Sequence, residues 1–152
     1  IIVEALTDNR NRTASNVRSA FQKFGGTMGE TGSVSHAFNH YGFVRYNKDV
    51  TSEEDFFNFS IEGGAEDCFI EEDTYEAVST PETLSNLYNY LDKKFGEPVS
   101  SGFQWKPVTY VAIEGDKLKS LINLLNELDN DEDVQQVFSN FEASDEELAK
   151  FA

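Results

Sequence analysis

The stretch from residue 41 to residue 107 contains an order of periodic segments that few folds can accommodate. Four strand-like runs alternate in it with two amphipathic, helix-like segments, the runs being 42–46, 65–70, 75–79 and 99–105. The pair Gly63-Gly64 ends the first helix-like segment, and Pro81 opens the second. The order is therefore β-α-β-β-α-β, which predicts a ferredoxin-like sandwich with both helices on one face of an antiparallel sheet.

The two flanking stretches each carry a β-α-β order, once before and once after this segment. Each has a strand-like run, an amphipathic helix and a second run, and the four runs are 1–6, 33–38, 108–113 and 134–141. Thr13 is the expected cap of the first of these helices, and Gly25-Gly26 is its expected stop. We therefore predict an α+β chain of two ferredoxin-like βαββαβ sandwiches, one inserted into the other, with the strand at 108–113 returning to the sheet that contains 1–6.

The predicted domains follow from this nesting. They are a split α+β domain of residues 1–40 plus 108–142, an inserted α+β domain of residues 41–107, and an acidic C-terminal tail of residues 143–152. The chain starts at Ile1, without methionine and directly in a strand-like run, so we interpret it as a fragment whose N-terminal part is missing.

Cysteine usage and hydropathy restrict the compartment. Cys68 has no second cysteine to pair with, so a reducing environment is expected, and we interpret it as a small buried side chain rather than a reactive thiol. No apolar run approaches the roughly 20 residues of a membrane span. The expected location is the cytoplasm, with the mitochondrial matrix as the alternative.

Charge is distributed very unevenly along the chain. Residues 1–48 carry six Lys and Arg against three Asp and Glu, whereas residues 49–152 carry six against twenty-five, in a chain whose net charge is −16. A polyanion is therefore approached favourably only by the N-terminal segment, since the remainder repels it.

The patterns that would indicate catalysis or a cofactor are weak. The acidic runs 53–55, 71–73 and 131–133 fall in turns and first helical turns, where carboxylates favour solvent and the helix dipole. His36 and His40 lie in or beside a strand, where a spacing of four does not place them on one helical face as a metal pair requires. The glycines at 25–32 follow a helix instead of preceding one, which is the reverse of a dinucleotide-binding loop. We expect no enzyme activity, no metal and no cofactor.

Four separated motifs resemble the YebC/PmpR family. They are Thr7-Asp8-Asn9-Arg10-Asn11-Arg12-Thr13, then Gly25-Gly26 with Gly32-Ser33-Val34-Ser35 and Phe38, then Gly64-Ala65-Glu66-Asp67, and Asp133-Val134-Gln135-Gln136-Val137-Phe138-Ser139-Asn140-Phe141. They occur in the family's order over nearly the whole chain. The resemblance implies the second and third domains of a three-domain protein whose basic, helical N-terminal domain is absent here.

The resemblance further implies a non-enzymatic regulator of gene expression. Bacterial members are described as DNA-binding transcriptional regulators, and members similar to the mitochondrial translational activator of cytochrome c oxidase act with the ribosome. We expect association with the ribosome or RNA by the full-length protein, with DNA-binding transcriptional regulation as the alternative. A second alternative is an acidic protein-interaction module whose insert contacts a basic protein. The fragment alone is expected to bind nucleic acid weakly or not at all, and no membrane is expected as a partner.

The candidate contact residues for nucleic acid or the ribosome are the basic side chains of the N-terminal segment. They are Arg10, Arg12, Arg18, Lys23 and Arg45. A structural interpretation competes with this one, in which Asp8 pairs with a neighbouring base and the remaining cations lie on a solvated helix face. Rings at Tyr41, Phe43 and Tyr46 could stack on single-stranded RNA, but we interpret them as core residues.

Overall fold

The computed structural model describes residues 1–151 and divides the chain into two compact units. One unit, called here the split unit, contains Ile1–Asn39 together with the described residues from Lys106 onward. The other, called the inserted unit, is His40–Trp105. Both combine helices with mostly antiparallel strands, so the α+β class predicted from the sequence is confirmed. That each unit folds independently as a domain stays a prediction.

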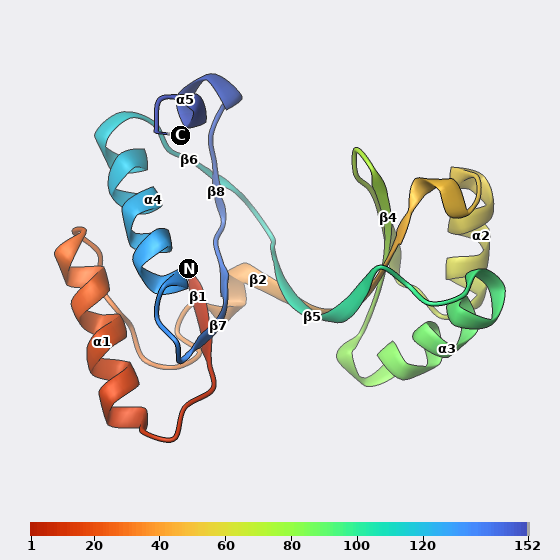
Figure 1. Cartoon of the computed structure of the whole chain (residues 1–152), viewed down its shortest axis with the longest axis horizontal. Coiled ribbons are helices and arrows are strands. Elements are labelled where there is room, and N and C mark those ends of the chain that lie inside the picture. The colour runs from red at the N-terminus through yellow and green to blue at the C-terminus, as the bar shows by residue number, and fades with distance from the viewer. Residues whose placement is uncertain (152) are drawn as a thin grey trace. The chain divides into compact units, whose positions relative to one another are not determined.

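The inserted unit is built on one four-stranded sheet. Its elements are β2 (Phe38–Asn47), η2 (Lys48–Val50), α2 (Glu53–Glu62), β3 (Asp67–Ile70), β4 (Thr74–Ser79), η3 (Pro81–Thr83), α3 (Leu84–Phe95) and β5 (Ser100–Pro107), where η marks a short 3-10 helix and the ends of β2 and β5 reach into the split unit. The strand order is β3-β4-β2-β5, and β4 runs antiparallel to both β2 and β3. This is the ferredoxin-like order, and α2 and α3 lie on the same side of the strands (Figure 1).

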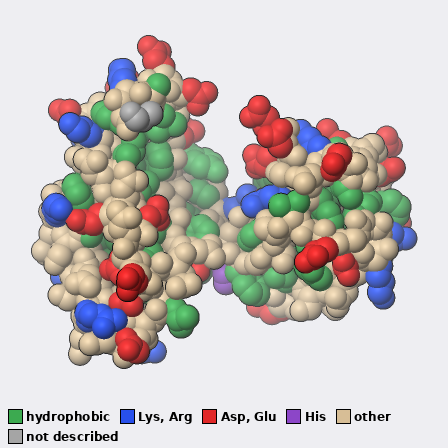
Figure 2. Space-filling view, in the orientation of Figure 1, with side chains coloured by type: hydrophobic (Ala, Val, Ile, Leu, Met, Phe, Trp, Pro, Cys, Tyr) green, Lys and Arg blue, Asp and Glu red, His purple; other side chains and the backbone are tan. Residues whose placement is uncertain are grey.

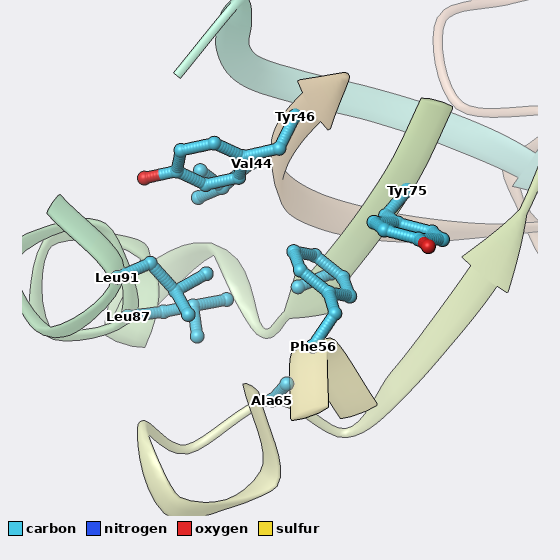
Figure 3. Packing of buried hydrophobic residues seen from close by; sticks show 8 residues of the cluster. Val44, Tyr46, Phe56, Ala65, Tyr75, Leu87 and Leu91 are labelled. Atoms are coloured by element: carbon cyan, nitrogen blue, oxygen red, sulfur yellow. The ribbon is translucent and has the colours of Figure 1, made fainter. Parts of the chain in front are cut away.

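The core of the inserted unit lies between the sheet and these two helices. Val44 and Tyr46 point to it from alternate positions of β2, and Leu87 and Leu91 from one face of α3 (Figure 3). Phe56 of α2 lies beside them and stacks on Tyr75 of β4. The Tyr46 hydroxyl donates a hydrogen bond of 2.8 Å to the Gly96 carbonyl, and burial raises the pKa of Tyr46 to about 12. The spacing of the apolar residues and the hydrogen bond of the Tyr46 hydroxyl are thus both consistent with this packing of the helices on the sheet.

The split unit has two smaller sheets. Its elements are β1 (Ile2–Ala5), α1 (Arg10–Lys23), η1 (Ser35–Ala37), β6 (Val111–Ala112), α4 (Gly115–Asp129), β7 (Val134–Phe138), β8 (Phe141–Glu142) and α5 (Asp145–Ala149). β1 pairs antiparallel with β7, and β6 pairs parallel with β8. Helices α1 and α4 pack together beside the β1–β7 pair (Figure 1), with Val17, Ala20 and Phe21 of α1 against Leu124 and Leu128 of α4.

Two strand predictions for the split unit are wrong. The run 33–38 forms turns and η1, because Ser33 N donates to Glu30 O and Ser35 Oγ donates to Gly32 O, so local hydrogen bonds satisfy this backbone; Phe38 already belongs to β2. The run 108–113 contains only the two-residue β6, which pairs with β8 instead of returning to β1. Within the described residues, the split unit therefore lacks the continuous four-stranded sheet predicted for it.

Candidate nucleic-acid interface

The turn that leads from β1 into α1 positions the first candidate arginines. The helix begins at Arg10, one turn earlier than predicted, and its cap is Asn9, whose Oδ1 accepts a hydrogen bond of 3.1 Å from Arg12 N. Thr7 Oγ1 accepts from Asn9 N at 3.0 Å and so closes the turn. The expectation that Thr13 caps this helix is wrong, since Thr13 lies inside the helix and is buried.

Asp133 connects this turn to the start of β7. Its Oδ2 accepts hydrogen bonds from Thr13 Oγ1 at 2.8 Å and from Arg12 Nη2 at 3.0 Å. Its backbone carbonyl accepts from Leu6 N at 2.9 Å. The hydrogen bonds from Thr13 and then Arg12 lower the pKa of the Asp133 carboxyl from its ordinary value. The first and last of the four sequence motifs therefore meet in one hydrogen-bonded joint.

Arg12 belongs to this joint. Its guanidinium also contacts Asp8 Oδ1 at 3.2 Å, and half of its side chain remains exposed. Hydrogen bonding to Asp133 raises the pKa of Arg12 further, so the cation is permanent. The structural interpretation of the turn, in which Asp8 pairs with a neighbouring base, holds for Arg12.

Two further candidate cations also have acidic partners within the chain. Lys23 Nζ lies 2.9 Å from Glu127 Oε1 of α4. Arg45 Nη2 lies 2.7 Å from Glu76 Oε1, whose side chain is buried and also accepts from Gln104 Nε2 at 3.1 Å. Because the loss of the cation from a buried ion pair is destabilising, Arg45 has a structural role in pairing with Glu76.

Arg10 and Arg18 differ from the other three candidates. Both are exposed, and no ion pair joins either to an acid among the described residues. At about 100° per residue, Arg12 and Lys23 fall on the flank of α1 that faces Asp133 and Glu127, and Arg18 falls on the other flank. Arg10, at the first position of the helix, lies about 80° from Arg18. The structure thus separates the predicted cluster into two sets.

The flank with Arg18 is polar and contains no carboxylate. Asn11, Ser15 and Gln22 lie near Arg18 on the helical wheel, and all three are exposed. No acidic residue occurs anywhere in α1, although Asp and Glu outnumber Lys and Arg by 28 to 12 in the chain. Asn11 was not among the contact residues predicted from the sequence. Its spacing of seven residues from Arg18 is the sequence signal that places both side chains on one face of the helix. This flank can donate hydrogen bonds and positive charge to phosphate oxygens.

The histidines and acidic residues are the candidates for a metal site. They contain no group of three or more His, Cys, Asp and Glu side chains able to hold a metal ion. His36 lies in η1, and His40 stacks on Trp105 with ring centroids 4.3 Å apart. Among the described helices, none has the length and apolar character needed to cross a bilayer.

Two comparisons relate this chain to known proteins. A family model described as the TACO1/YebC second and third domain matches residues 1–141. The crystal structure of a conserved hypothetical protein from Aquifex aeolicus is similar over 94% of this chain, with 38% sequence identity and a TM-score of 0.82. The chain spans 59% of the length of that protein.

Proposed function

The chain belongs to the TACO1/YebC family, whose model carries the label of a transcriptional regulator, and from this premise we propose that it is part of a non-enzymatic regulator of gene expression that associates with the ribosome. The observation that carries the proposal is the acid-free Arg18 flank of α1 together with Arg10 in its first turn, since both arginines are exposed and neither has an acidic partner among the described residues. We assign the contact with RNA phosphates to this flank.

The charge distribution favours a ribonucleoprotein over duplex DNA. Duplex DNA carries phosphates along its whole length, so it repels a chain of net charge −16 in most orientations of that chain. A ribosome presents both RNA phosphates and basic protein segments, so the basic flank and the acidic remainder can both face complementary charge. DNA-binding transcriptional regulation is the competing function.

A ribosome co-sedimentation assay tests the proposal. The variant R10A/R18A should weaken binding and flatten the plot of log affinity against log salt by about 0.7 to 0.9 for each lost phosphate contact. The matched control is K117A/K119A, which removes two exposed lysines of α4 that likewise have no acidic partner in the structure. An unchanged slope for R10A/R18A, or an equal change in the control, contradicts the assignment to this flank.

Duplex DNA provides the second arm of the test. We expect the chain to give no gel shift with duplex DNA at micromolar concentration and about 150 mM salt, because too few of its cations are available to neutralise phosphates. A retained shift under these conditions would favour the transcriptional role.

A further inference from the structure

A groove with an apolar floor lies in the inserted unit between α2 and the edge strand β3. It is open to solvent, has a volume of about 500 Å³ and is lined by Glu53, Glu54, Phe57, Cys68 and Ile70. The side chains of Phe57 and Ile70 are 48% and 40% exposed, although both are large and apolar. Ile61, one turn after Phe57 on α2, is 44% exposed and extends this apolar surface along the helix. The residues of the inserted unit leave the groove open.

The rim of the groove is acidic and uncompensated. Glu53 and Glu54 stand at its α2 end, and residues 71–73, all acidic, form the turn that follows β3. None of these carboxylates has an ion pair with a Lys or Arg in the described part of the chain. Figure 2 shows acidic side chains gathered over the tip of this β3–β4 hairpin. The inserted unit as a whole carries fourteen Asp and Glu against four Lys and Arg.

We propose that this groove binds a lysine- or arginine-rich segment of a partner protein, with one bulky apolar side chain of the segment seated against Phe57 and Ile70. An apolar anchor inside a charged rim is the usual arrangement of a peptide site, in which the anchor contributes affinity and the rim contributes specificity and association rate. The carboxylates at 53–54 and 71–73 match a basic segment and repel nucleic acid. The site is independent of the α1 flank.

The backbone of the edge strand β3 favours a partner that binds through its side chains over one that adds a strand to the sheet. Glu71 N donates a hydrogen bond to Thr74 O at the end of the β3–β4 pair. Because the backbone N–H groups of an antiparallel strand point alternately toward and away from its partner, the N–H of Cys68, three residues earlier, points away from β4. The Asp67 carboxylate accepts that N–H at 2.8 Å, so the exposed edge is already partly satisfied. β3 is only four residues long, which further limits pairing with another strand. The apolar floor therefore remains as the feature that a partner can use.

Two heptapeptides test the proposal by fluorescence anisotropy with the full chain. One has phenylalanine between two runs of three lysines, and the other has alanine in that position. The phenylalanine peptide should bind at least about tenfold more tightly, as burial of a side chain of that size implies. F57S should abolish this difference, whereas V99S, which alters a similarly exposed apolar residue of the same unit, should preserve it. E53Q/E54Q should weaken both peptides, whereas the matched control D145N/E146N on α5 should change neither.

The single cysteine gives an independent readout. Cys68 lines the groove and is half-buried, and burial raises the pKa of its thiol, so alkylation by N-ethylmaleimide should be slow and should slow further when the phenylalanine peptide is bound. Equal affinity for the two peptides, or an unchanged preference in F57S, overturns the proposal. If sedimentation velocity shows self-association that F57S removes, a second copy of the chain covers the groove and the proposal is likewise overturned.

Discussion

The inserted unit and the split unit both pack helices against strands, but they differ in the size of their sheets. The inserted unit has a continuous four-stranded sheet whose buried cluster includes Tyr46, Phe56 and Leu87, whereas the split unit has two two-stranded sheets and a smaller buried cluster on α1 and α4. The split unit compensates with polar connections, above all the joint of Asp133 with Arg12 and Thr13. The comparison teaches that the unit with the larger core carries the acidic surface, and that the unit held by a polar joint carries the basic flank.

Removal of the inserted unit gives the largest expected effect on this comparison. Ala37 O accepts a hydrogen bond of 2.9 Å from Val108 N, so the two ends left by excising residues 40–105 lie beside each other and a short Gly/Ser linker can join them. We expect the remaining split unit to keep a cooperative thermal transition, measured by far-UV circular dichroism. Loss of that transition would mean that the two cores depend on each other.

Matched core truncations should separate the stabilities of the two units. Leu87 and Leu128 are 0% and 1% exposed, and replacing either by Ala should cost about 2–5 kcal/mol. The single tryptophan, Trp105, lies in the inserted unit, so urea unfolding followed by its fluorescence should shift in L87A and not in L128A. Far-UV circular dichroism should report both shifts. Equal fluorescence shifts in the two variants would show that the units unfold together.

The polar joint makes the split unit sensitive to acid. The folded-state pKa of Asp133 is lowered, so its contribution to stability is present above the unfolded pKa, about 4, and is lost as the pH falls through the folded value. D133N should therefore lower the melting temperature at neutral pH and reduce the loss of stability between about pH 4 and pH 2. D131N, at a neighbouring carboxylate that accepts a hydrogen bond from Asp133 N and has no ion pair among the described residues, is the control. An identical pH profile for D133N and the unaltered chain would contradict this role.

The smallest expected effect distinguishes the two flanks of α1. R10A/R18A should change stability by no more than about 0.5 kcal/mol, because exposed side chains without partners contribute little. R12A should lower the melting temperature more than either single variant R10A or R18A, because it removes the cation that pairs with Asp133. Melting curves at low and high salt provide the measurement. A greater loss of melting temperature in R10A than in R12A would contradict the structural role given to Arg12.

Much of the inserted unit was predictable, because its order depends on local signals. The stop at Gly63-Gly64 marks the end of α2 in the sequence as it does in the structure. Alternation in β2 buries Val44 and Tyr46, so the interpretation of Tyr46 as a core residue is confirmed. The same interpretation is wrong for Phe43, which is only partly buried and lies beneath the Arg45 guanidinium, because neighbouring positions of a strand face opposite sides. Neighbouring positions determine such features, and a single sequence contains them.

The candidate interface was predictable only in composition. The sequence alone determined an α+β chain with an acidic middle and an acid-free, arginine-bearing helix. It could not determine which arginines stay available, because Asp133 and Glu127 lie more than one hundred positions from Arg12 and Lys23. Nor could it show that the run 33–38 forms turns or that β6 pairs with β8, because alternation is a property of a strand and not of its partner. Only the tertiary structure brings these acids to α1 and leaves Arg10 and Arg18 without them, since ion pairing depends on distance in space.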